Sequence, residues 1–409
     1  MLNFEFQNPT KILFGEGQIA AIGREIPENA RILITYGGGS VLRNGVLDEV
    51  KSALSGRQLF EFGGIEPNPT YETLMKGLEI IKAESINFLL AVGGGSVIDG
   101  TKFLAAAACW ELGDPWDILL HAGKGIHRAL PLGTVLTLPA TGSEMNCGAV
   151  ISRANRQINL PAGGGSVNAG VQSVITQSYN EKLFFTNPLV YPRFSVLDPS
   201  KCYTLPARQV GNGIIDSFVH VTEQYLTYVT GAKVQDRLAE GLLLTLIEEG
   251  PRALLEPENY EVRANLMWTA TLALNGLIGA GVPQDWTTHM IGHELTALYG
   301  MDHAQTLAVV LPALLTLQLD EKLDKLVQYG ERIWGIREGS DKARAEEAIA
   351  RTRAFFESVG VGTRLSDYGV KEENLGEVLE RLSQHGFVIL GEHQSVTLER
   401  VRQILLAAL

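Results

Sequence analysis

The sequence predicts two domains, an α/β domain over residues 1–200 and an all-helical domain over residues 201–409. Three observations support this division. A chain of 409 residues exceeds the ~250–300 residues at which a single hydrophobic core stops growing. Short apolar runs alternate with helical patterns in the first half, whereas only helical patterns follow Asp198-Pro199. The hydrophobic content of 45% is ordinary for a soluble globular protein.

Buried parallel strands are expected in the first half. Each candidate is apolar on successive residues rather than on alternate ones, which is typical of a strand covered on both faces. Helical patterns lie between these runs, for example over Val46–Leu54 and Tyr71–Ala83. Strands that alternate with helices predict a doubly wound α/β domain. The expected strands are Arg31–Tyr36, Ile86–Val92, Gly133–Leu138 and Phe194–Leu197.

Long helical patterns fill the second half. The first begins after Thr204, a residue type that caps helix N-termini, and has Pro206 in its first turn. The expected helices are Pro206–Leu226, Lys233–Glu249, Tyr260–Leu277, Asp285–Tyr299, Asp320–Trp334, Lys342–Val359 and Leu398–Leu409.

Composition argues against several classes of function. With a net charge of −12, the surface repels phosphate backbones and anionic lipids, so no nucleic acid or membrane partner is expected. The N-terminus has no signal-peptide pattern, and no apolar run approaches the ~20 residues of a membrane span. Cys109, Cys147 and Cys202 are far apart, which predicts neither disulfides nor a thiolate zinc site. These features indicate a cytoplasmic protein.

A glycine-rich turn marks the expected nucleotide site. Gly93–Ser96 follows an expected strand and leads into a helical pattern that contains Asp99. Without Cβ atoms the backbone can approach a pyrophosphate closely, and a helix N-terminus offers unpaired N–H groups. A tight strand-to-helix turn without a ligand has the same sequence pattern, so this motif alone leaves both interpretations open.

Two other glycine motifs have structural interpretations. Gly15–Ala20 matches GxGxxA but follows only the short run Lys11–Phe14, and no acidic residue ends a second strand at the usual distance. We interpret it as a structural turn. The GGGS at residues 163–166 has no apolar run before it and is interpreted as a flexible loop.

One aspartate and several histidines form a candidate metal site. Asp216 and His220 are four residues apart in a helical pattern, which places both on one helix face, and His289 and His293 share the same spacing. His303 lies beyond the end of the second helix, in a turn. A carboxylate with imidazoles suits Fe²⁺ or Zn²⁺. An isolated Asp/His pair is usually an ordinary hydrogen-bonded pair, but the additional histidines favour metal binding.

Several motifs together point to a family. They are PTKILFGEG at the start, GGIEPNPT at 63–70, AVGGGSVIDGTK at 91–102, TLPATGSE at 137–144 and the Asp216/His220/His289/His303 set. Over essentially its whole length the chain resembles the iron-containing (group III) alcohol dehydrogenases, and within them the NADPH-dependent aldehyde reductases or butanol dehydrogenases. The resemblance implies a Rossmann-like N-terminal domain, a helical C-terminal domain and an active site in the cleft between them, an architecture also found in dehydroquinate synthase.

The same resemblance implies site residues. It implies one divalent metal ion, Fe²⁺ or Zn²⁺, bound by Asp216, His220, His289 and His303, with His293 close to the reacting centre. It also implies a homodimer. Cofactor contacts are implied at Asn68, Gly94, Gly95, Ser96, Asp99, Thr137, Thr141, Asn146 and Lys182.

The residue that follows an early strand indicates which nicotinamide cofactor the chain prefers. NAD-preferring members of the family place an aspartate there, where it binds the ribose hydroxyls, whereas this chain has Gly38 at the equivalent position. Without that carboxylate, a 2′-phosphate meets no like-charge repulsion. Ser40 can donate a hydrogen bond to it, and Arg43 supplies positive charge. NADP(H) is therefore expected in preference to NAD(H).

The expected activity is transfer of a hydride between NADP(H) and small aldehydes or primary alcohols. His293 is the candidate for proton relay to solvent, with a purely structural histidine as the alternative. The segment Arg153–Glu181 is longer than is usual in the subgroup. It is either an inert surface loop or a segment that alters substrate access, and the placement of Lys182 depends on it.

The sequence is also compared with three alternative functions. A lyase related to dehydroquinate synthase would need Lys or Arg near the metal for its polyanionic substrate, and residues 285–306 contain none. A glycerol-dehydrogenase-like enzyme is a further alternative. A nucleotide-binding protein without catalysis would not need a complete metal site.

Overall fold

A six-stranded sheet with parallel pairings forms the core of the first half of the chain. The computed structural model describes residues 1–161 and 174–409. The strands lie in the order β1-β8-β5-β4-β2-β3. Their bounds are β1 Lys11–Phe14, β2 Arg31–Tyr36, β3 Gln58–Phe62, β4 Phe88–Gly94, β5 Leu132–Leu138 and β8 Phe194–Leu197.

The four strands expected from the sequence are confirmed, with shifts of one or two residues at their ends. The sequence did not predict β1 and β3 as strands. These two strands form the two edges of the sheet. In β3, Gln58 and Glu61 are exposed and only Phe62 is buried, so this strand lacks the continuous apolar run that marks the central strands.

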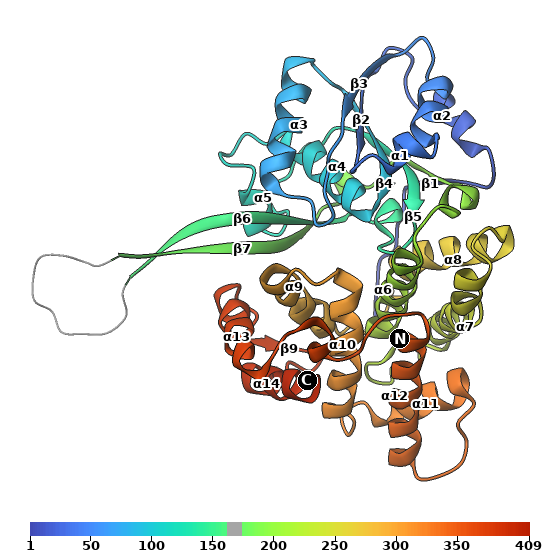
Figure 1. Cartoon of the computed structure of the whole chain (residues 1–409), viewed down its shortest axis with the longest axis vertical. Helices are drawn as coiled ribbons and strands as arrows, with labels where there is room; N and C mark the ends of the chain where they lie inside the picture. Colours follow the sequence, from blue (N-terminus) through green and yellow to red (C-terminus); the bar gives the residue numbers. More distant parts are fainter. Residues whose placement is uncertain (162–173) are drawn as a thin grey trace, which may run out of the picture.

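Helices cover both faces of the sheet (Figure 1). Alternate residues of β2 show this, because Leu33 packs into one hydrophobic cluster while Ile32 and Ile34 pack into another. The doubly wound α/β prediction is therefore confirmed. The helices of this half are α1 Ser40–Arg43, α2 Val46–Ala53, α3 Tyr71–Ala83, α4 Gly95–Ala107 and α5 Asp117–Leu120.

The GxGxxA segment forms a turn that leads from β1 into a 3-10 helix at Gln18–Arg24. The Gly17 N–H donates to Asp198 Oδ2 at 2.9 Å. The Gly17 N–H is therefore already paired with a carboxylate of the protein, which agrees with the structural interpretation.

A long antiparallel hairpin projects from the α/β half (Figure 1). It consists of β6 (Gly148–Pro161) and β7 (Val174–Thr186). It contains most of the segment expected to be a long insertion, and the sequence did not predict these strands. The GGGS motif at 163–166 lies outside the described residues.

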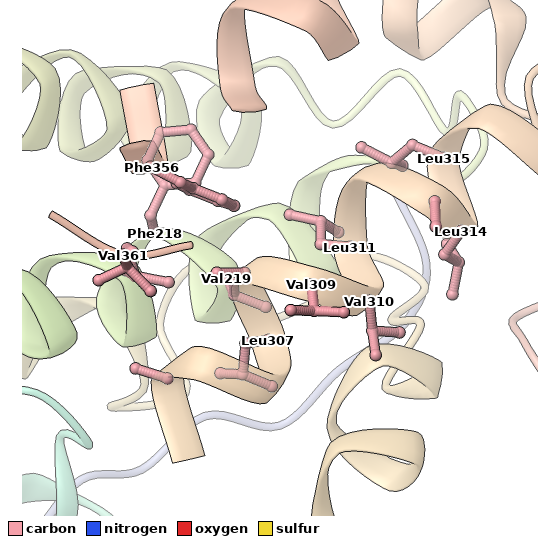
Figure 2. Close-up of a cluster of buried hydrophobic side chains, with 14 of the residues drawn as sticks. Phe218, Val219, Leu307, Val309, Val310, Leu311, Leu314, Leu315, Phe356 and Val361 are labelled. Carbon is pink, nitrogen blue, oxygen red and sulfur yellow. The ribbon is translucent and has the colours of Figure 1, made fainter. Parts of the chain in front are cut away.

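The second half is helical and surrounds a separate hydrophobic core. Figure 2 shows part of it, where Val219 of α6 lies near Leu307 and Leu311 of α10. A two-stranded sheet of β9 (Ile389–Leu390) and β10 (Val396–Thr397) accompanies the expected helices. The helices are α6 Ala207–Tyr225, α7 Lys233–Leu255, α8 Tyr260–Ala273, α9 Thr287–Tyr299, α10 His303–Leu317, α11 Leu323–Trp334, α12 Asp341–Ser358, α13 Leu375–Gln384 and α14 Leu398–Ala407.

The sequence did not predict α10 or α13. Nearly every residue from Ala304 to Leu315 in α10 is buried, so the helix shows no polar face and no amphipathic period. The ten residues of α13 do have an amphipathic pattern, with Leu375, Val378 and Leu382 buried on one face, so the sequence carries a helical signal there that the prediction did not include. Within the described part of the chain, no helix is both long enough and apolar enough to cross a membrane.

Candidate metal and cofactor site

Three helices bring the predicted metal ligands together. Asp216 and His220 lie one turn apart on α6, His289 lies on α9, and His303 is the first residue of α10. Asp216 Oδ1 lies 3.6 Å from His220 Nε2, 3.9 Å from His289 Nε2 and 3.6 Å from His303 Nε2. These separations are too long for hydrogen bonds. They are close to the ~3.4 Å between neighbouring ligand atoms arranged tetrahedrally at ~2.1 Å around one ion.

Burial supports the same interpretation. Asp216 Oδ1 and His289 Nε2 are buried, and neither has a hydrogen-bond partner among the described residues. Buried polar atoms are normally paired, so a cation is the partner that this donor set fits. Burial raises the pKa of Asp216 to about 7 and lowers the pKa of His220 and of His303 well below the usual range. The two imidazoles are therefore neutral, which is the form that binds a metal.

Glu223 orients one of the predicted ligands. Its carboxylate contacts His289 Nδ1 and also accepts a hydrogen bond from the His289 backbone N–H at 3.2 Å. Burial lowers the pKa of His289, but the Glu223 carboxylate more than offsets that effect and raises it. A proton held at Nδ1 leaves Nε2 free to face Asp216. Glu223 was not predicted from the sequence, although it follows Asp216 by seven residues on the same face of α6.

His293 lies beside this group, one helical turn after His289 on α9. Its ring centroid is 5.4 Å from that of His303 and 6.3 Å from that of His289. Burial lowers the pKa of His293 well below the usual range, so its imidazole is neutral.

The predicted phosphate-binding turn joins β4 to α4. Gly94 is the N-cap of α4, and Gly95 begins the helix. A Cβ on Gly95 would lie 2.3 Å from Thr141 Oγ1, so the loop after β5 packs directly against the helix N-terminus. Ser96 Oγ accepts a hydrogen bond from the Asn68 N–H at 3.3 Å. Position 95 requires a glycine, because any Cβ atom there would collide with Thr141 in the loop after β5.

Asp99 and Asn146 belong to a buried hydrogen-bond network. Ser143 Oγ donates to Asp99 Oδ1 at 2.5 Å, and the Val150 N–H donates to Asp99 Oδ2 at 2.9 Å. Lys102 Nζ donates to Ser143 Oγ at 2.9 Å and to Asn146 Oδ1 at 2.8 Å. This network fixes the loop that follows β5. The sequence did not predict this role for Lys102, although it follows Asp99 by three residues on α4.

Burial lowers the pKa of Lys102 to about 8, against the opposing attraction of Asp99. The side chain has no exposed surface. Hydrogen bonds to Ser143, Asn146 and the Gly148 carbonyl offset part of the cost of burying this ammonium, and they tie α4 to the loop after β5.

Lys182 lies where the hairpin meets both predicted sites. It is on β7, and its Nζ donates to Asn68 Oδ1 at 2.9 Å. Burial lowers the pKa of Lys182 to about 8, while Asp216 and Asp99 both act to raise it. The Lys182 ammonium is therefore attracted by the predicted ligand Asp216 as well as by Asp99 on α4.

The remaining predicted cofactor residues lie at the carboxyl edge of the sheet. Because β5, β4 and β2 are adjacent, the loops that follow them are neighbours. Gly38 and Ser40 follow β2 and are exposed, and Thr137 is near the end of β5 with Thr141 just beyond. The sheet therefore gathers the predicted cofactor contacts along one edge.

The same edge touches the helix that carries Asp216. A Cβ on Gly213 of α6 would lie 2.4 Å from the Pro139 carbonyl oxygen. Ser217 Oγ donates to the Ala140 carbonyl at 3.2 Å. The candidate metal ligands thus lie next to the loop that contains Thr141.

Comparison with known proteins places the chain among dehydrogenases. The family model described as iron-containing alcohol dehydrogenase matches residues 9–171, and the model for the C-terminal part of that family matches residues 211–409. The chain is 57% identical over 409 residues to the NADPH-dependent aldehyde reductase YqhD of Escherichia coli (strain K12), with 100% of both chains covered. It is 40% identical over 381 residues to the NADH-dependent butanol dehydrogenase B of Clostridium acetobutylicum, which covers 92% of this chain and 91% of that protein.

Solved structures agree with the sequence comparison. The substrate- and cofactor-free form of the aldehyde reductase YqhD from E. coli superposes with a TM-score of 0.87 at 54% identity, over 100% of both chains. An NADH-dependent butanol dehydrogenase A from Thermotoga maritima superposes with a TM-score of 0.89 at 33% identity, over 100% of this chain and 99% of that one. The chain belongs to the iron-containing alcohol dehydrogenase family.

Proposed function

We propose that this chain is an NADP(H)-dependent aldehyde reductase that uses one divalent metal ion. The observation that carries the proposal is the convergence of Asp216, His220, His289 and His303, with a buried carboxylate oxygen that has no hydrogen-bond partner among the described residues. The substrates are small neutral aldehydes and the corresponding primary alcohols. The family and its relatives are dehydrogenases and reductases, so we set aside the lyase and the non-catalytic protein.

The chain's residues would perform distinct tasks. A bound metal ion supplies a Lewis acid for the substrate oxygen, and a bound nicotinamide supplies or accepts the hydride. Gly94, Gly95 and Ser96 offer the N-terminus of α4 to the pyrophosphate. Glu223 keeps His289 in the orientation that a metal ligand needs. His293, a neutral imidazole next to the ligand set, is the proposed proton relay.

NADP(H) is the proposed cofactor, and three features of the chain support it. Gly38 provides no carboxylate at the end of β2, and Ser40 is exposed at the start of α1. The Arg43 guanidinium lies near this loop, with Nη1 3.7 Å from where a Cβ on Gly39 would be. The 57% identical relative is named as NADPH-dependent. Relatives of 38–40% identity include NADH-dependent butanol dehydrogenases, so the preference varies within the family.

The decisive test combines an activity assay with elemental analysis. Purified protein should oxidise NADPH in the presence of butanal, and NADPH should give the higher kcat/KM when compared with NADH. Elemental analysis should find about one Fe or Zn per chain. Removal of the ion by a chelator should abolish the activity, and Fe²⁺ or Zn²⁺ should restore it. Full turnover by metal-free protein, or no NADPH oxidation with any short aldehyde, would refute the proposal. Light scattering of the same sample checks the expected homodimer.

A further inference from the structure

The middle of strand β7 contacts the helical half through two side chains of α13. Arg381 Nη2 donates to the Asn180 carbonyl oxygen of β7 at 2.6 Å. One turn later on the same helix, His385 Nε2 lies 3.8 Å from Glu181 Oε1. Figure 1 shows α13 next to α9, on the side of the helical half that lies below the hairpin. One helix face therefore contacts two consecutive residues of the strand.

Glu294 of α9 completes this group. It contacts His385 Nδ1 through Oε1 at 2.6 Å, and its Oε2 lies 3.9 Å from Arg381 Nε. The side chains of Arg381, Glu294, Glu181 and His385 are 1%, 2%, 4% and 8% exposed. We call these four residues the α13 clamp.

The charges of the α13 clamp balance. Burial acts to lower the pKa of His385, but its contacts with Glu181 and Glu294 raise it to about 9. Two cations therefore face two carboxylates at neutral pH. Buried charges are tolerated only when they are paired in a well-defined geometry, so the group tolerates little displacement. Because Arg381 bonds to a backbone carbonyl, it fixes the strand itself and not only a side chain.

The strand that the clamp holds carries Lys182. Successive side chains of a strand point to opposite faces, so Glu181 faces α13 while Lys182 points the other way. The Lys182 ammonium reaches Asn68 at 2.9 Å. Asp216 and Asp99 also attract it. A shift of β7 at Glu181 would therefore move the ammonium away from both predicted sites.

We propose that Arg381 and His385 are positioning residues for Lys182, which they place to meet the anionic nicotinamide dinucleotide. They act through β7 and do not contact the reacting atoms. The inference rests on the proposed function, in which Lys182 contacts the cofactor. It explains why a helix near the end of the chain has a buried arginine whose guanidinium bonds to the backbone of a distant strand.

A double-mutant cycle tests this inference. Dissociation constants for NADPH would be measured by nicotinamide fluorescence for the unmodified protein, R381M, K182M and the double variant. We expect R381M to weaken NADPH binding by about tenfold, and the double variant to bind no more weakly than K182M alone. Metal content should remain unchanged in all four proteins. If Arg381 acts through Lys182, the losses of NADPH affinity in R381M and K182M should not add in the double variant. If R381M instead weakened binding through a general loss of stability, its effect would add to that of K182M.

Controls separate the possible failures. Arg402 also forms an ion pair in the helical half, 3.9 Å from Glu372, but both side chains are exposed, so R402M should leave NADPH binding unchanged. If R381M does not fold, H385Q enters the same cycle, because it retains a polar group beside Glu294. Additive losses, or unchanged binding in R381M and H385Q, would overturn the positioning role. A wild-type protein that does not bind NADPH would instead refute the proposed function.

Discussion

Gly38 is the residue at which one substitution should change the cofactor preference. A Cβ added there would meet no atom within 4 Å, and the glycine is exposed, so an aspartate can be accommodated. Its carboxylate would repel the 2′-phosphate of NADPH and would accept hydrogen bonds from the ribose hydroxyls of NADH. We expect G38D to shift the ratio of kcat/KM values toward NADH by about tenfold or more. G38N is the matched control, and an equal shift in that variant would show that charge is not the cause.

His293 is the residue at which the proposed proton transfer can be tested. General acid–base groups contribute about 10²–10⁴-fold, so H293A should lower kcat by at least ~10²-fold and should alter the pH profile. Metal content should not change, because the four proposed ligands remain. The control is His127, an exposed histidine in the α/β half, whose replacement by alanine should have no effect. An unchanged rate and pH profile in H293A would mean that this histidine is structural.

Residues were predictable from the sequence where the signal is local. The spacing of Asp216 and His220 identifies one helix face directly. Glu223 extends the same face by one turn, but a glutamate in a helical pattern is usually a solvated residue. Its role depends on α9, which brings His289 within hydrogen-bond distance. Lys102 was missed for a similar reason, because its three hydrogen-bond acceptors lie in a loop about forty residues later.

At the scale of elements, α6 can be tested through its contact with the loop after β5. Alanine at position 213 would bring a methyl group within 2.4 Å of the Pro139 carbonyl oxygen. Such overpacking costs ~1–3 kcal/mol, which exceeds the gain of up to ~1 kcal/mol in helix propensity. G213A should therefore lower the Tm.

Gly241 on α7 is the matched control for that substitution. It is exposed, and an added Cβ would meet no atom within 4 Å. G241A should therefore raise the stability slightly through helix propensity alone. If both variants shifted the Tm in the same direction, the contact between Gly213 and the Pro139 carbonyl would not explain the effect of G213A.

The elements that the sequence failed to predict share physical features. The edge strands β1 and β3 are too short or too exposed to show a buried run. In contrast, α10 is too completely buried to show an amphipathic period. The sequence of the β6–β7 hairpin does not form a long continuous apolar run. Its strands also pair residues that are far apart in the chain, such as Gly148 and Thr186. The sequence signal therefore identified the continuous apolar runs of the central strands and most of the helices, and it failed at the short or exposed edge strands and at the almost uniformly apolar α10.

At the scale of the whole molecule, two of the contacts between the halves bear directly on the predicted sites. The Ser217 hydroxyl bonds to the loop after β5, and Arg381 bonds to the backbone of β7. The first contact places Asp216 beside the sheet edge, and the second holds the strand that carries Lys182. Both predicted sites therefore depend on how the halves are joined as well as on their own elements.

The sequence by itself determined the sheet-then-helix order, the glycine turn after β4 and the residue types suited to a metal, because these depend on local periodicity and spacing. Only the tertiary structure decided that His303 begins a buried helix, that Glu223 orients His289, and that α13 reaches back to β7. Those contacts join residues that lie from tens of positions to about two hundred positions apart in the chain. Such pairings leave no periodic trace in the sequence, because each depends on the packing of several elements at once.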